Sequence, residues 1–139
     1  MIRRLIILLL IVGCGTEPED VHPLVGEWEF IQRTFTFTLY SSPPSVCDGL
    51  ESHVTTLTSS DYQETIILSS DNTMILSIGN DSTNLGWSFT ENTFNLWAEN
   101  DPSDIESYDY SISGNTLTFN EGTEQNCGTE LTERTYAKQ

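Results

Sequence analysis

The feature that most constrains the fold of this chain is an alternation of apolar and polar residues in short runs. Residues 24–30 form the clearest run, with Leu, Gly, Trp and Phe at the even positions and two glutamates at odd positions. A period of two is typical of a strand with one buried side and one side facing water. After residue 24, no stretch keeps the apolar spacing of an amphipathic helix over three turns. The pattern therefore predicts an all-β chain.

Clusters of turn-forming residues, such as 69–72 and 113–115, separate successive runs at hairpin spacing. We therefore expect eight or nine antiparallel strands in up-and-down order. Closure into a small β-barrel of about eight strands is favoured, because it removes exposed strand edges. The first expected strand covers about 24–32, and its apolar alternation resumes at 35–39. The other expected strands cover about 51–58, 62–68, 73–78, 87–89, 94–96, 108–112, 117–119 and 129–138.

The apolar residues of the first strand change parity, from even positions up to Phe30 to odd positions from Phe35 onward. A β-bulge or bend near Arg33 and Thr34 would keep both sets inward. Residues 51–58 are β-branched but weakly apolar, which predicts a weak edge strand. The polar segments 99–104 and 121–128 are expected to be loops.

The N-terminus has the features of an export signal. Arg3 and Arg4 are followed by an apolar run, residues 5–12, that is too short to span a bilayer as a helix. Residues 11–14, Ile-Val-Gly-Cys, resemble the lipobox of bacterial lipoproteins, which implies cleavage before Cys14 and lipidation of its sulfur. The alternatives are an ordinary signal peptide or an uncleaved anchor. We expect a signal peptide at 1–13, an acidic flexible tether at 14–23 and a barrel domain at 24–139.

The charge of the chain excludes one class of partner. Cleavage would remove Arg3 and Arg4, leaving three basic residues against 21 acidic ones and changing the formal charge from −16 to −18. Such a surface repels phosphate backbones, so no nucleic-acid partner is expected. The same charge favours solubility.

The cysteines predict one disulfide. If Cys14 carries lipid, Cys47 and Cys127 remain, and an exported chain folds in an oxidising compartment. A bond between them would close a loop of about 80 residues, worth on the order of 4 kcal/mol in the chain-entropy model. The alternative is two free thiols or half a metal site, although no histidine is near either cysteine in sequence.

Three segments follow one another along the chain: Leu-x-Gly-x-Trp at 24–28, the hairpin at 67–74 and the hairpin at 108–117. In this order they resemble lipocalin-like domains of Bacteroidota-type lipoproteins. The resemblance implies a barrel attached to the cell envelope by a lipid on Cys14, with the outer membrane as the expected location, and binding of a small apolar or amphipathic ligand. The alternative is a structural or protein-interaction module with a filled barrel and an unknown protein partner.

No pattern indicates catalysis. The two histidines, His22 and His53, lie outside any nucleophile motif, and the acidic run 99–104 lacks the spacing of an EF-hand loop. We therefore expect no enzyme, no catalytic residue, no cofactor and no metal site.

Inward-facing aromatic residues are the candidates for ligand contact. Each could equally be part of a packed core, since a barrel of this strand number is just filled or holds one small ligand. Trp97 falls on the face opposite Phe94 and Leu96, so it is either an exposed contact residue or the mark of a second bulge. The candidates are Trp28, Phe30, Phe89, Tyr108 and Tyr110.

Overall fold

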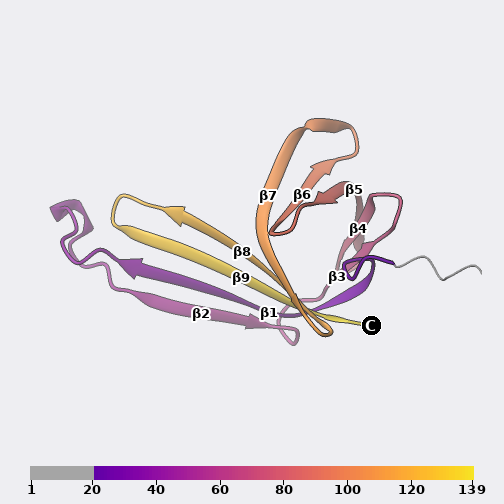
Figure 1. Cartoon of the computed structure of the whole chain (residues 1–139). Coiled ribbons are helices and arrows are strands. Elements are labelled where there is room, and N and C mark those ends of the chain that lie inside the picture. The colour runs from indigo at the N-terminus through magenta and orange to yellow at the C-terminus, as the bar shows by residue number, and fades with distance from the viewer. Residues whose placement is uncertain (1–20) are drawn as a thin grey trace, which may run out of the picture.

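The computed structural model describes residues 21–139, which fold into nine strands and one 3-10 turn, η1 (Ser45–Cys47). The predictions about the signal peptide, the lipidation of Cys14 and the tether up to residue 20 lie outside this range. All nine expected strands are present. They are β1 (Gly26–Leu39), β2 (His53–Thr58), β3 (Glu64–Leu68), β4 (Thr73–Ile78), β5 (Asp81–Phe89), β6 (Thr93–Ala98), β7 (Asp101–Ser113), β8 (Thr116–Glu124) and β9 (Gly128–Lys138) (Figure 1).

The strands confirm the predicted antiparallel barrel. From β3 to β9, each strand pairs with the next one in the sequence, and β1 pairs with both β3 and β9. These pairings close eight strands, β1 and β3–β9, into a barrel. The ninth strand, β2, pairs only with β1 and lies at the edge of the sheet, as the weakly apolar sequence of 51–58 predicts.

The long strand β1 belongs to two parts of the molecule. Its first residues, Gly26 to Glu29, pair with β3, whereas Gln32 to Phe37 pair with β2. Its register against β9 shifts between Phe30 and Gln32, which leaves Ile31 as an extra residue. This is the predicted bulge, placed slightly earlier than expected. It makes the inward positions even before the shift and odd after it.

Beyond the barrel, four strands continue as an open sheet, which we call the arm. It consists of residues 32–39 of β1, all of β2, residues 120–124 of β8 and residues 128–133 of β9. Figure 1 shows the arm extending to the left, away from β3, β4 and β5. A disulfide between Cys47 and Cys127, with Cα atoms 5.6 Å apart, joins two loops at its tip, as predicted.

Two segments that the sequence suggests are loops belong to strands. β8 continues to Glu124, and β7 already begins at Asp101, so the connections shrink to residues 125–127 and 99–100. These strand ends are polar on both faces, so they carry no alternation for sequence reasoning to detect. Residues 121–124 of β8 all pair with β9, and β7 pairs with β6 at Asp101 and again from Ile105; such pairing does not depend on side-chain polarity.

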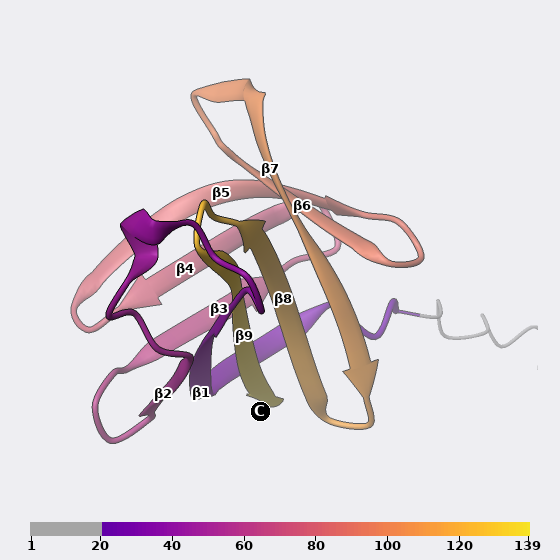
Figure 2. The same cartoon turned by 90° about the vertical axis from the view of Figure 1, so that its left-hand side faces the viewer.

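The core runs through the barrel and closes one of its ends, which we call the closed end. Leu24 and Trp28 are fully buried there, and the indole N–H of Trp28 donates a 2.8 Å hydrogen bond to the carbonyl oxygen of Leu24. The Lys138 ammonium lies 5.2 Å from the centre of the Trp28 ring. Figure 2, viewed from the arm, shows β3, β4 and β5 on one side of the barrel and β7 and β8 on the other. The core consists of Leu24, Trp28, Phe30, Ile66, Leu68, Met74, Trp87, Phe94, Leu117, Phe119 and Tyr136.

Candidate functional site

The strand register shows that the barrel has a second, different end. Gly26 pairs with Leu68 and Trp28 pairs with Ile66, so the N-terminal end of β1 lies beside the C-terminal end of β3. Glu64, the first residue of β3, therefore lies at the opposite end from Leu24 and the closed end. We call this opposite end the mouth.

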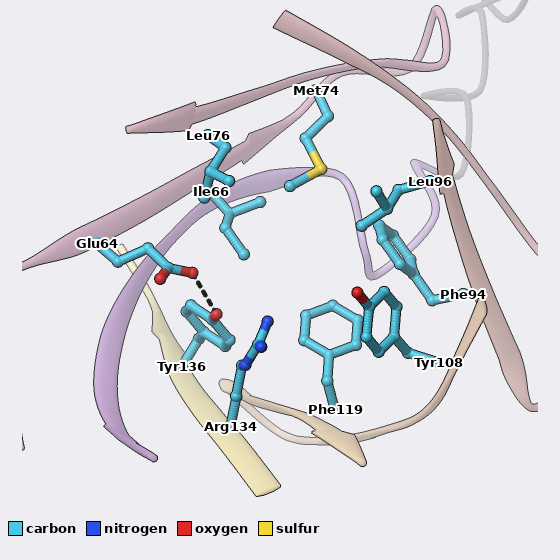
Figure 3. A pocket seen from close by; sticks show the side chains of 10 residues that line it. All are labelled: Glu64, Ile66, Met74, Leu76, Phe94, Leu96, Tyr108, Phe119, Arg134 and Tyr136. Atoms are coloured by element: carbon cyan, nitrogen blue, oxygen red, sulfur yellow. Dashed lines mark hydrogen bonds between the residues drawn. The ribbon is translucent and has the colours of Figure 1, made fainter. Parts of the chain in front are cut away.

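A pocket of about 50 Å³ lies inside the barrel at the mouth (Figure 3). Its walls come from six strands, β3, β4, β6, β7, β8 and β9. Apolar side chains form most of the lining: Ile66, Met74, Leu76, Phe94, Leu96 and Phe119. Four polar or charged side chains complete it: Glu64, Tyr108, Arg134 and Tyr136.

Tyr136 and Glu64 link two strands that do not pair with each other. The Tyr136 hydroxyl donates a short hydrogen bond to the Glu64 carboxylate, drawn in Figure 3. Burial is the main cause that raises the pKa of Tyr136 well above 10, and the charge of Glu64 adds to it. The positive charges of Arg134 and Arg33 partly oppose this rise in the pKa of Tyr136, so both guanidinium groups are close enough to act on its hydroxyl.

Tyr108 contributes a second polar group to the pocket. Its hydroxyl donates a 2.7 Å hydrogen bond to the carboxylate of Glu106, on the same strand. Burial, followed by this hydrogen bond, raises the pKa of Tyr108 to about 12. The Arg134 guanidinium carbon lies 6.0 Å from the centre of the Tyr108 ring, at the outer limit of a cation–π contact.

The two arginines of the described chain form a cross-strand pair. Arg33 of β1 lies directly opposite Arg134 of β9, so both side chains leave the sheet on the same face. Within residues 21–139, neither guanidinium has a carboxylate oxygen within 4.0 Å or donates a hydrogen bond to protein. Figure 3 shows Arg134 reaching into the pocket between Tyr136 and Phe119.

The predicted ligand-contact residues are divided between the pocket and the core. Tyr108 lines the pocket. Trp28 and Phe30 point inward as expected but belong to the packed core, where the Phe30 ring meets Tyr62 and Tyr136 edge-on.

The other two predicted residues lie elsewhere. Phe89 is 37% exposed and stacks against His22, with ring centroids 3.9 Å apart. Tyr110 packs against the core, and its hydroxyl donates a 2.9 Å hydrogen bond to the carbonyl oxygen of Thr90. Neither residue lines the pocket.

Trp97 agrees with the second interpretation, a bulge, since its side chain is half-buried rather than exposed. It pairs with Gly86 of β5. A Cβ added to Gly86 would lie 2.1 Å from the indole nitrogen of Trp97, so the indole occupies the space that a side chain at position 86 would need. A register shift follows directly, between Trp97 and Ala98. Trp97 therefore covers the outer face of the barrel at a glycine, beside a bulge.

Sequence reasoning did not identify Glu64, Arg134 and Tyr136 as site residues. A usable signal existed in the last strand, where Arg134 and Tyr136 share one face at a spacing of two. Arg134 is also one of three basic residues after residue 20. A cation on the same face as a core tyrosine is unusual enough to mark a site.

Comparisons with protein-family models, curated proteins and solved structures found no match. In the part of the chain that the structure covers, no helix has the length and apolar character needed to cross a bilayer. Among those same residues, no three His, Cys, Asp or Glu side chains gather as a metal site.

Proposed function

We propose that this chain is a lipid-anchored envelope lipoprotein whose lipocalin-like barrel binds a small amphipathic ligand at its mouth. The observation that carries the ligand is the pocket, which joins an apolar wall to a polar rim inside an otherwise packed barrel. Such a combination of apolar lining and few polar groups is typical of small-molecule sites. The anchor rests on the leader and on the lipobox that ends at Cys14.

The size of the pocket limits the ligand. At about 50 Å³, it is far smaller than the roughly 300–1,000 Å³ of sites that enclose drug-sized molecules. We therefore expect a short apolar group to enter between Leu76, Leu96 and Phe119, while the polar part of the ligand stays at the mouth.

The described chain starts at the closed end, where His22 packs on Phe89. A lipid on Cys14 would therefore attach the domain on the side of the closed end, and the mouth would open at the other end. This arrangement leaves the mouth accessible from the aqueous side of the envelope.

A second candidate function, protein interaction, is favoured by the arm. All six residues of β2 are exposed, and β2 pairs with β1 on one side only. Apart from His53, β2 carries no titratable side chain, so it lacks the charges that usually protect an edge strand. A partner strand could add to this edge.

Native mass spectrometry of the purified full-length protein tests the ligand proposal. We expect a co-purifying small mass in the wild type and its loss in Leu76→Trp, which fills the pocket. Ile75→Trp is the matched control, because Ile75 is the neighbouring residue and is exposed. A wild type that carries no small mass and binds no amphiphile added to it would refute ligand binding and favour the arm as the functional surface.

A further inference from the structure

We propose that the polar part of the ligand is a carboxylate and that Arg134, assisted by Arg33, binds it. This inference rests on the proposed ligand-binding function and specifies the chemistry of the ligand. Four observations carry it: the distribution of positive charge, the unused donors of Arg134, the state of the nearby carboxylates and the apolar wall.

The positive charge of the described chain is concentrated at the mouth. Residues 21–139 contain three basic side chains, and Lys138 is engaged at the closed end, where its ammonium donates a 2.9 Å hydrogen bond to the carbonyl oxygen of Pro23. The other two, Arg33 and Arg134, face each other across neighbouring strands. Like charges directly opposite in a sheet are destabilising, and an anion between them would reverse that effect.

Arg134 has the donors that a carboxylate requires. Its guanidinium carries five N–H groups in a planar fork that matches the two oxygens of a carboxylate. The side chain is half-buried and extends into the pocket (Figure 3), and within residues 21–139 its guanidinium donates no hydrogen bond to a protein acceptor. In such partly apolar surroundings, a charge-assisted pair of hydrogen bonds is stronger than it would be in water.

Three carboxylates lie near this site and limit which anion it accepts. Glu64 already receives the Tyr136 hydroxyl, and Glu106 receives the Tyr108 hydroxyl. Glu121 is exposed, and its charge helps to raise the pKa of Tyr108. Because these charges oppose the two arginines, a ligand with a single negative charge fits better than a doubly charged phosphate.

The apolar lining of the pocket determines that the rest of the ligand is an apolar group. Phe119 pairs with Arg134 across β8 and β9, so an apolar surface lies directly beside the guanidinium. A carboxylate held by Arg134 would therefore direct its own carbon chain along Phe119 and toward Leu96. The chemical class that this arrangement recognises is a carboxylic acid with a short alkyl or aryl group.

Titration calorimetry of the full-length protein in lipid nanodiscs tests the inference, with empty nanodiscs as the blank. The ligands are hexanoate, hexanamide and hexylamine, which share one chain and differ in the charge of the head group. We expect hexanoate to bind about tenfold more tightly than hexanamide, because a bidentate charged contact is worth more than a neutral one. Arg134→Gln should remove this difference, because the carboxylate loses its charged donor.

Further variants separate the guanidinium fork from charge alone. Arg134→Lys should retain only part of the preference for hexanoate, and Arg33→Gln should weaken hexanoate binding several-fold. Lys138→Gln removes the same charge at the closed end and should change nothing. Circular dichroism checks that each variant retains its sheet content.

The possible outcomes separate a failure of the carboxylate assignment from a failure of the proposed ligand-binding function. Equal affinity for hexanoate and hexanamide, or hexanoate binding that survives Arg134→Gln, overturns the carboxylate assignment while ligand binding stands. Tighter binding of hexylamine would overturn it in favour of Glu64 as the contact for a cationic head group. Failure of all three compounds to bind the wild type would count against the ligand-binding function itself.

Discussion

Gly128 begins β9 at a point where the backbone leaves no room for a side chain. It pairs with Leu39, and a Cβ built on it would lie 2.2 Å from the carbonyl oxygen of Thr38. Because that oxygen belongs to the backbone of a paired strand, it cannot move aside as a flexible side chain would.

We therefore predict that Gly128→Ala lowers the free energy of unfolding by about 1–3 kcal/mol, in the range of overpacking substitutions. Gly122→Ala, on the neighbouring strand of the arm, is the matched control, because its nearest contact would be 3.8 Å away. Urea denaturation of both variants measures the difference. Equal losses would show that the close approach at Gly128 does not constrain the fold.

The raised pKa of Tyr136 predicts that the free energy of unfolding decreases at alkaline pH. Burial raises its pKa in the folded state above the ordinary value of 10. The stabilisation linked to the neutral hydroxyl is thus complete below pH 10 and is lost as the pH rises from 10 toward the folded-state pKa. Stability should fall by up to about 1.4 kcal/mol per pH unit for this group.

Denaturation midpoints measured from about pH 9, below this window, to about pH 12, inside it, check this prediction. Tyr136→Phe should be less stable at neutral pH, because the Glu64 carboxylate loses its donor, but its stability should decline less steeply above pH 10. A slope that is the same in the wild type and the variant would contradict the assignment.

At the scale of elements, the arm depends on a covalent bond at its tip. The Cys47–Cys127 disulfide spans 80 residues and holds the loop after β1 against the loop between β8 and β9. A 3.0 Å hydrogen bond from the Tyr40 backbone N–H to the carbonyl oxygen of Cys127 lies beside it. Few buried apolar side chains support the arm, since Phe37 and Cys47 are its buried hydrophobic residues in the described range.

We predict that the double variant Cys47→Ser, Cys127→Ser loses about 4 kcal/mol of stability, because the unfolded chain regains the freedom of a long loop. Urea denaturation with and without reductant measures this loss in the wild type. In the variant, which has no disulfide to reduce, the reductant should not change the denaturation midpoint. If reduction of the wild type left its midpoint unchanged, strand pairing alone would be sufficient to hold the arm.

The element boundaries also show how far local patterns reach. Alternation, together with the β-branched composition of β2, located all nine strands, and the parity change between Phe30 and Phe35 located the bulge to within a few residues. It did not reveal that β8 continues through polar residues, because that end is defined by its pairing with β9, nor that β7 begins at Asp101, which pairs with Ala98. The length of the arm was therefore hidden from the sequence.

At the scale of the whole molecule, the proposed attachment to a membrane depends on one residue, Cys14. The lipobox interpretation predicts that cells supplied with labelled palmitate incorporate the label into the wild type and not into Cys14→Ala. Fractionation should move the variant from the membrane to the soluble fraction, since the acyl chains supply the anchoring free energy. Label that persists in Cys14→Ala would contradict the lipoprotein assignment.

The candidate site could be predicted only in part, and particular residues show why. Tyr108 was selected because an alternating strand directs it inward, and it does line the pocket. Trp28 and Phe30 satisfied the same rule and were found in the core, because alternation indicates the side of a strand but not the position along the barrel axis.

By itself, the sequence determined the all-β class, the order of the strands, the inward faces and the cysteine pair. These follow from the fixed direction in which successive side chains leave a strand and from the small number of cysteines available. Only the tertiary structure decided that β1 leaves β3 to join β2, that β9 closes the barrel, and that Arg33 meets Arg134 at the mouth. The register between strands so distant in sequence is set by the packing of the whole barrel, which no local pattern encodes.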